Sequence, residues 1–204
     1  MISNWAYYYI RKDFIPLIDA FADCLKKRVL PSFENLSSEA DEVENEAWNQ
    51  LSSFAPEDSD PSDFVESAFN AGLEFYQTMT ELAQGMRNLF AVGLYHLFEQ
   101  QFLRFHRGEL LDFGEQDDPN LFKTSEAVKR LAGHGIHIDE FGSWAKVKEL
   151  KTLANAVKHA DGGACDELKR VRPDLFSHPE GRELGPYSLD GLRVFQPLEA
   201  KTYT

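Results

Sequence analysis

The chain of 204 residues has only two cysteines, Cys24 and Cys165, and they lie far apart in the sequence. So few cysteines argue against a disulfide framework and favour free thiols in a reducing compartment. The first residues lack a basic segment followed by an apolar one, so no secretory signal is predicted. Apolar runs are broken by polar residues before they reach the roughly 18 residues that a membrane-spanning helix needs. We therefore expect a cytoplasmic protein that does not enter a membrane.

Basic residues are missing from one long stretch. No Lys or Arg occurs between Arg28 and Arg87, whereas thirteen acidic residues do. Of the 34 acidic residues, 34 - 13 = 21 therefore lie outside this stretch, where they are balanced by the 21 basic residues of the chain. The net charge of -13 belongs to this stretch. Such a chain does not coat duplex DNA by electrostatics alone. The most acidic part, residues 34–66, is most simply a solvated surface; nucleic-acid mimicry or contact with a basic partner is the alternative.

Alternation of β-branched and polar residues is almost absent, and helical periodicity replaces it. We expect an all-α, single helical domain over residues 1–176, a bundle of about six to seven helices with the acidic segment 34–66 inserted near its start. An irregular tail follows over 177–204, with one short extended candidate at 192–195. The predicted helices cover 3–30 (kinked or interrupted at Pro16), 38–53, 62–109 (two helices or one bent helix, with the break near Gln84–Gly85), 120–133, 143–160 and 164–172.

The helix predicted at 143–160 has its polar residues on one face. At about 100° per residue, Val147, Leu150 and Leu153 share the packing side. The opposite side and its edge form a surface that we call the lysine face, made of Lys148, Lys151, Asn155, Lys158 and His159. This face combines cationic and hydrogen-bonding groups, so we expect it to be the working surface of the protein.

A second polar set lies on the apolar helix at 62–109. Asn88, Glu99 and His106 fall within about 20° of one another, and His96 lies about 60° away. An unpaired buried Glu99 would cost several kcal/mol, so it needs a partner, for which Lys151, Lys158 or His159 is available. These residues form either an internal network that sets the register of two helices or, with the lysine face, one polar cleft.

Metal and cofactor motifs are missing as well. His96-x-x-Glu99 is a single pair in the reverse of the di-iron order, and His134-x-x-His137 flanks a glycine without paired ligands. Phosphate loops, dinucleotide fingerprints and nucleophile elbows are also absent. We therefore expect neither a metal nor a cofactor.

Two segments of the second half carry a family resemblance. They are Leu94-Tyr-His-Leu-Phe-Glu99 and Trp144-x-x-Val-Lys-Glu-Leu-Lys-x-Leu-Ala-Asn-Ala-Val-Lys-His-Ala-Asp-Gly162. Over residues 90–176 the chain resembles HEPN-like helical proteins of prokaryotic defence and toxin–antitoxin systems. The resemblance implies a small helical bundle that forms a homodimer. Active members are metal-independent ribonucleases with an arginine followed a few residues later by a histidine.

His159 matches the histidine of that motif and Asn155 its polar position, but the arginine is missing. Thr152, Leu153 and Ala154 stand where it would be. Lysine is a point charge and does not reproduce the bidentate guanidinium fork. The favoured hypothesis is therefore a module that binds RNA, or a partner protein of the same system, through the lysine face without catalysis.

Two other interpretations stay open. The first is a divergent, metal-independent endoribonuclease with His159 as acid or base, Asn155 as orienting group and Lys151 or Lys158 in place of the arginine. In this reading Lys148, Glu99 and His96 line the substrate cleft. The second is a fully buried network without a binding role, in which Asn155 and His159 would be inaccessible to solvent.

Overall fold

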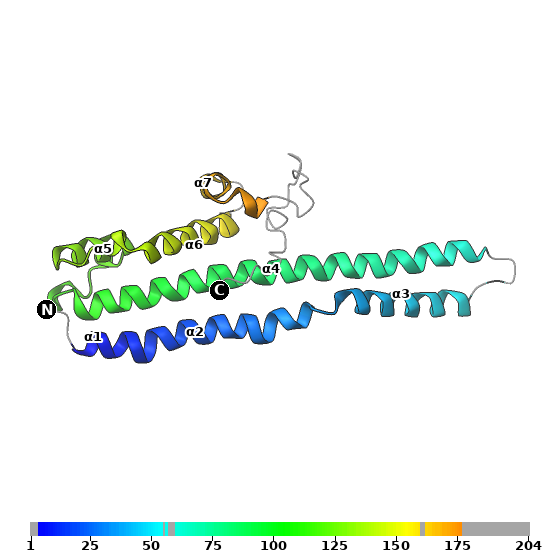
Figure 1. Cartoon of the computed structure of the whole chain (residues 1–204), viewed down its shortest axis with the longest axis horizontal. Coiled ribbons are helices and arrows are strands. Elements are labelled where there is room, and N and C mark those ends of the chain that lie inside the picture. The colour runs from blue at the N-terminus through cyan, green and yellow to red at the C-terminus, as the bar shows by residue number, and fades with distance from the viewer. Residues whose placement is uncertain (1–3, 55, 57–59, 160–161, 177–204) are drawn as a thin grey trace.

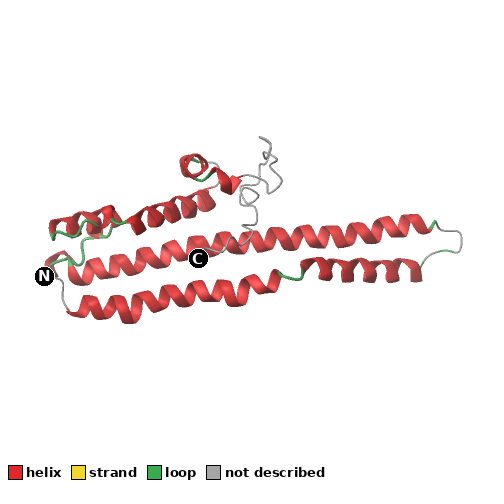
Figure 2. Cartoon of the chain, viewed as in Figure 1, coloured by secondary structure: helices red, strands yellow, loops and turns green. Residues whose placement is uncertain are grey.

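The computed structural model describes residues 4–54, 56, 60–159 and 162–176. Helices dominate this part of the chain, and none of these residues forms a β-strand (Figure 1 and Figure 2). The fold class is therefore all-α, as the sequence predicts. The tail at 177–204, with the extended segment expected at 192–195, lies outside the described residues.

The first described residues form one helical rod with π-helical turns. It contains α1 (Asn4–Tyr9), a π-helical turn at Ile10–Phe14, α2 (Ile15–Cys24), a second π-helical turn at Leu25–Val29 and a 3₁₀ turn at Leu30–Phe33. Pro16 has no amide hydrogen, and in an α-helix its ring would clash with the carbonyl four residues earlier. The wider turn directly before it relieves both problems. The kink expected at Pro16 thus takes the form of a π-helical turn, and the helix continues.

The next two helices make a long antiparallel hairpin, shown at the right of Figure 1. They are α3 (Leu36–Ser53) and α4 (Pro61–Glu109). The Asp60 carboxylate caps α4 by accepting a hydrogen bond from the Ser62 amide at 2.9 Å. At about 1.5 Å per residue, α4 is about 70 Å long. The chain is therefore elongated, with its other helices along one half of α4 (Figure 1).

The prediction of two separate helices divided near Gln84–Gly85 is wrong, because α4 runs without interruption through 49 residues. A glycine inside a helix costs only about 1 kcal/mol relative to alanine, which packing on both sides of it offsets. The number of long helices is therefore also lower than predicted. Among the described residues, five helices have ten residues or more, fewer than the six to seven expected.

The remaining helices are shorter. They are α5 (Thr124–Gly133), α6 (Gly142–His159) and α7 (Gly163–Val171), with 3₁₀ turns at Phe113–Glu115, Pro119–Leu121, Ile138–Glu140 and Pro173–Phe176. The helix expected at 120–133 begins four residues later, since Pro119–Leu121 forms its own turn. After α5, Gly135 takes a φ of 79°, in the left-handed region that favours glycine. Its amide and that of Ile136 bond back to carbonyls of α5, which ends the helix.

The core is concentrated at the end of α4 that is distant from α3. One buried cluster joins α1, α4 and α5 through Ala6, Tyr9, Phe102, Phe105, Leu110, Ala127 and Leu131. Trp144 of α6 packs on it, with ring centroids 6.0 Å from Phe102 and 6.3 Å from Phe98. A second cluster joins α6, α7 and the following turn through Ala156, Cys165, Leu168 and Leu175. These contacts fix α6, which carries the lysine face, along α4.

Within the described helices, none combines the length and the hydropathy needed to span a bilayer.

Candidate functional site

The lysine face lies on α6, and most of its side chains are in solvent. Lys148, Lys151, Lys158 and His159 are exposed, and Asn155 is partly exposed. The opposite side of α6 packs inward, with Ala154 and Ala156 buried. A fully buried polar network, one of the three interpretations of the sequence, therefore does not describe this face.

The three lysines of this face are free to meet a ligand. None of them forms an ion pair within the described part of the chain, whereas Lys146 on the same helix bonds Glu149 at 3.1 Å. Glu149 also pairs with Arg172 beyond α7. Burial would raise the pKa of Glu149, but the hydrogen bonds from Lys146 and Arg172 outweigh it and lower the pKa. The one carboxylate of α6 is thus paired with other cations and not with the lysine face.

A polar cavity of about 410 Å³ adjoins the lysine face. It lies among α4, the start of α5 and α6, and is lined by Glu99, Leu103, Phe122, Lys123, Thr124, Ser125 and Lys151. The structure thus brings together Glu99 and Lys151, which the sequence placed on two separate polar stripes. Lys123, Thr124 and Ser125 were missed by the sequence analysis, because they are adjacent to α6 only in space.

Glu99 is held by hydroxyl groups. Its Oε1 accepts hydrogen bonds from Tyr95 Oη at 3.0 Å and from Thr124 Oγ1 at 3.2 Å. Burial and the adjacent Glu99 raise the pKa of Tyr95 to about 12, so its hydroxyl stays protonated and donates. The expectation that Lys151, Lys158 or His159 pairs with Glu99 is not met, since no described cation forms an ion pair with it. Two neutral donors satisfy the carboxylate instead.

The other polar residues of α4 do not join the cavity. His96 is exposed and bonds Gln100 on its own helix, with 3.0 Å between the two Nε2 atoms. Asn88 is buried and accepts a hydrogen bond from Gln84 Nε2 at 3.0 Å. Lys148, Asn155, Lys158 and His159 are likewise outside the set of cavity-lining residues. The predicted cleft is therefore a cavity with one lysine of the face at its edge.

His106 belongs to a different cluster, around Arg130 of α5. The guanidinium of Arg130 forms two hydrogen bonds to Glu115, at 2.7 and 2.8 Å, and a third to the Leu110 carbonyl at 3.1 Å. These bonds and the Asp112 amide lower the pKa of Glu115 to about 2. His106 is fully buried, and burial together with Arg130 lowers its pKa against the opposing effect of Glu126 and Glu115. No local pattern in the sequence indicates this cluster, because ion pairing at long separation has no periodicity.

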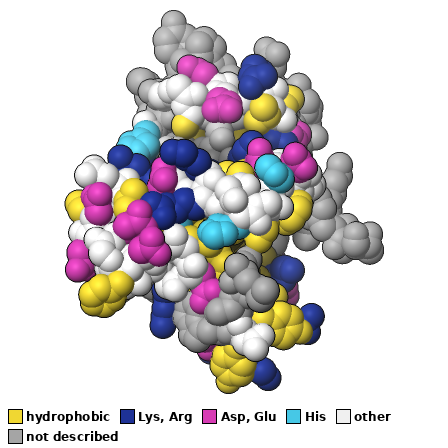
Figure 3. Space-filling view, turned by 90° about the vertical axis from the view of Figure 1, so that its left-hand side faces the viewer, with side chains coloured by type: hydrophobic (Ala, Val, Ile, Leu, Met, Phe, Trp, Pro, Cys, Tyr) yellow, Lys and Arg dark blue, Asp and Glu magenta, His cyan; other side chains and the backbone are white. Residues whose placement is uncertain are grey.

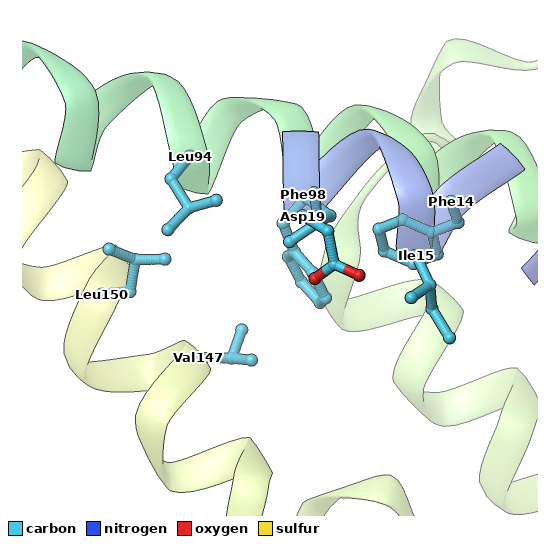
Figure 4. Close-up of a pocket in the computed structure, with 8 residues that line it drawn as sticks. Phe14, Ile15, Asp19, Leu94, Phe98, Val147 and Leu150 are labelled. Atoms are coloured by element: carbon cyan, nitrogen blue, oxygen red, sulfur yellow. The ribbon is translucent and has the colours of Figure 1, made fainter. Parts of the chain in front are cut away.

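A second cavity, of about 390 Å³, is apolar. Side chains from the first helical rod, α4 and α6 point into it (Figure 4). It is lined by Phe14, Ile15, Ile18, Asp19, Leu94, Phe98, Val147 and Leu150. Asp19 is its one charged residue, so the cavity suits an apolar group rather than a phosphate.

The end of the molecule at the left of Figure 1 has mixed charge. Viewed from that side, Lys, Arg, Asp, Glu and His side chains are interspersed (Figure 3). Oppositely charged neighbours partly cancel each other's field, so this end does not attract polyanions as a whole. No group of three or more His, Cys, Asp or Glu side chains in the described residues could hold a metal ion.

Comparisons with protein-family models, curated proteins and solved structures find no match to this chain.

Proposed function

We propose that this chain is a HEPN-like interaction module of a defence or toxin–antitoxin system that binds RNA through the lysine face without cleaving it. The observation that carries the proposal is the set of three exposed lysines that form no ion pair with any described residue, with Asn155 between them on the same helix. Unpaired lysines bind phosphates by charge, and an amide can bond a base or a ribose hydroxyl. Lys123 and the hydroxyls of Thr124 and Ser125 extend the surface across the polar cavity.

RNA is favoured over a protein partner on this face because the face is cationic and contributes few apolar side chains. Protein interfaces are built around buried apolar anchors, whereas phosphate binding needs exposed cations. The absence of an arginine at the motif positions before His159, which hold Thr152, Leu153 and Ala154, favours binding over catalysis. Cleavage without a metal needs a fixed cation beside the acid or base, and a flexible lysine positions charge less well.

The test is a titration of a short fluorescein-labelled single-stranded RNA with the full chain, read by fluorescence anisotropy. The variant Lys148→Ala/Lys151→Ala/Lys158→Ala should weaken binding strongly. Each phosphate contact contributes a slope of about −0.7 in log K against log salt, so losing three contacts should flatten the slope by about two. The matched control Lys12→Ala/Lys26→Ala/Lys27→Ala removes the same charge from the first helical rod and should bind RNA like the wild type.

Equal affinity of the two triple variants would contradict the proposal, as would absence of binding by the wild type. The same samples, incubated in EDTA and run on a denaturing gel, test the divergent ribonuclease. Cleavage by the wild type and none by His159→Ala would replace the binding module with a metal-independent endoribonuclease. His159 is exposed, so this substitution should leave the fold intact.

A further inference from the structure

The α3–α4 hairpin has a line of large apolar side chains in solvent. Val65 and Phe69 are each 54% exposed, Leu73 41% and Tyr76 44%. At about 100° per residue these four lie within about 80° of arc on α4. We call them the hairpin stripe. Single exposed apolar residues are ordinary on protein surfaces, but a contiguous line of them is typical of an interaction site.

The stripe lies beside the face of α4 that α3 covers. Gly72 is buried against α3, and a Cβ added there would lie 2.9 Å from the Ala40 carbonyl oxygen and 3.1 Å from Glu44 Cβ. At this end of the molecule α3 packs on α4, while α5 and α6 lie along the other half of α4 (Figure 1). An apolar face next to a helix–helix contact is the place that a third helix occupies in a bundle.

Acidic residues surround the stripe. Glu66 follows Val65 on α4 and is exposed, and Glu44 of α3 borders Gly72 on the other side. Neither carboxylate forms an ion pair among the described residues. The sequence between Arg28 and Arg87 contains no Lys or Arg that could neutralise them. An apolar line between uncompensated carboxylates is complementary to an apolar line between cations.

A second copy of the chain fits this surface poorly. Two hairpins meeting through their stripes would bring together two segments with thirteen acidic and no basic residues each. Like charges facing each other across an interface oppose association by several kcal/mol and discriminate against such a partner. The charge therefore selects an occupant of opposite sign.

We propose that the α3–α4 hairpin is a docking surface for a basic amphipathic helix of a partner protein. The apolar side of that helix packs on Val65, Phe69 and Tyr76, and its flanking Lys or Arg residues meet Glu44 and Glu66. The three helices then form one bundle. This surface is separate from the lysine face, so the inference does not depend on RNA binding.

Three labelled synthetic peptides of equal length test the surface, each titrated with the full chain by fluorescence anisotropy. The first is an amphipathic helix with Leu on one side and Lys on its flanks. The second replaces the Leu residues with Gln, and the third replaces the Lys residues with Glu. The first peptide should bind at least about tenfold more tightly than either of the others, since both the apolar contacts and the charges contribute.

Variants locate the binding on the hairpin. Phe69→Ser/Tyr76→Ser should weaken binding of the first peptide by about tenfold or more. Phe113→Ser is the matched control, because Phe113 is 93% exposed at the opposite end of α4 and its loss should leave binding unchanged. Glu44→Gln/Glu66→Gln should weaken binding and flatten its salt dependence. Circular dichroism confirms that each variant is folded.

Three results would overturn the proposal. In the first, the stripe variant and the wild type bind the basic peptide equally. In the second, the Gln peptide binds as tightly as the Leu peptide, which would reduce the contact to electrostatics. In the third, sedimentation shows a wild-type dimer that Phe69→Ser/Tyr76→Ser makes monomeric, which would identify a second copy as the occupant. RNA affinity of the stripe variant, measured in parallel, keeps failure here distinct from failure of the lysine face.

Discussion

At the scale of single residues, Arg130 and His106 show how charge is arranged next to the main core. Arg130 satisfies Glu115 with two parallel hydrogen bonds, a geometry that only a guanidinium provides. His106 lies in the same region without a partner at either ring nitrogen in the described part of the chain. A neutral imidazole tolerates this position better than an imidazolium does, because burial penalises the charged form most.

His106 should make stability depend on pH. Its pKa is lowered in the folded state, by burial first and by Arg130 second. The unfolded chain then binds more protons than the folded chain below the ordinary histidine pKa of about 6.5. Stability is therefore fully retained above that pH and is lost progressively as the pH falls toward the folded-state pKa. Urea unfolding of the wild type should show a lower free energy of unfolding at about pH 5.5 than at about pH 7.5.

The variant His106→Gln removes the titrating group and should show a smaller loss of stability between the same two pH values. His137→Gln is the control. His137 is exposed, so this variant should show the same pH dependence of stability as the wild type. If His106→Gln lost as much stability as the wild type between these two pH values, a group other than His106 would be responsible and the assignment to His106 would be wrong.

At the scale of elements, two glycines of α4 should respond in opposite ways to the same substitution. Gly85 has open space around it, so Gly85→Ala should stabilise the chain by about 0.5–1 kcal/mol through the lower backbone entropy of alanine. At Gly72 a Cβ would press on the Ala40 carbonyl oxygen of α3, 2.9 Å away. Overpacking of this kind costs about 1–3 kcal/mol, which exceeds the gain in helix propensity. Thermal unfolding should place the two variants on opposite sides of the wild type.

Stabilisation by both substitutions would mean that α3 moves away from α4 at little cost. That outcome would also weaken the proposed docking surface, because the stripe and Glu44 are held together by the same contact. The hairpin has few large buried side chains to resist such a movement, since Leu36, Ala68 and Gly72 are its most buried residues.

At the scale of the whole molecule, the two halves of α4 differ in packing and charge. One half lies in the main core, whereas the other packs mainly against α3 and lies in the acidic stretch (Figure 1). Local stability follows buried apolar contact, and repulsion among like charges opposes compact packing. We expect amide hydrogens of α3 and of α4 near Val65 to exchange with solvent at least about tenfold faster than those near Phe102.

Hydrogen exchange with mass spectrometry measures this difference. Added salt should slow exchange in the hairpin more than in the core half, because it screens repulsion among the acidic side chains. The basic amphipathic peptide should protect the hairpin selectively. Uniform protection along α4 would contradict the expected difference between the halves.

Local sequence patterns determined the helical class and the approximate ends of most helices. Apolar spacing marked α4 and α6, because helix formation depends on neighbours three and four residues apart. The same periodicity separated the lysines of α6 from its packing side. The division into two helices at Gly85 was wrong because tertiary contacts outweigh the small cost of one glycine in a helix.

Tertiary structure alone decided which polar groups meet. Glu99 bonds Thr124 of α5 rather than a lysine, Arg130 pairs with Glu115, and Lys123 and Lys151 line the same cavity. It also decided that the stripe of α4 stays in solvent beside α3 while Phe98 and Phe102 are covered by Trp144. Apolar spacing shows that a helix has a side to bury, but long-range packing determines which part of that side finds a partner within the chain.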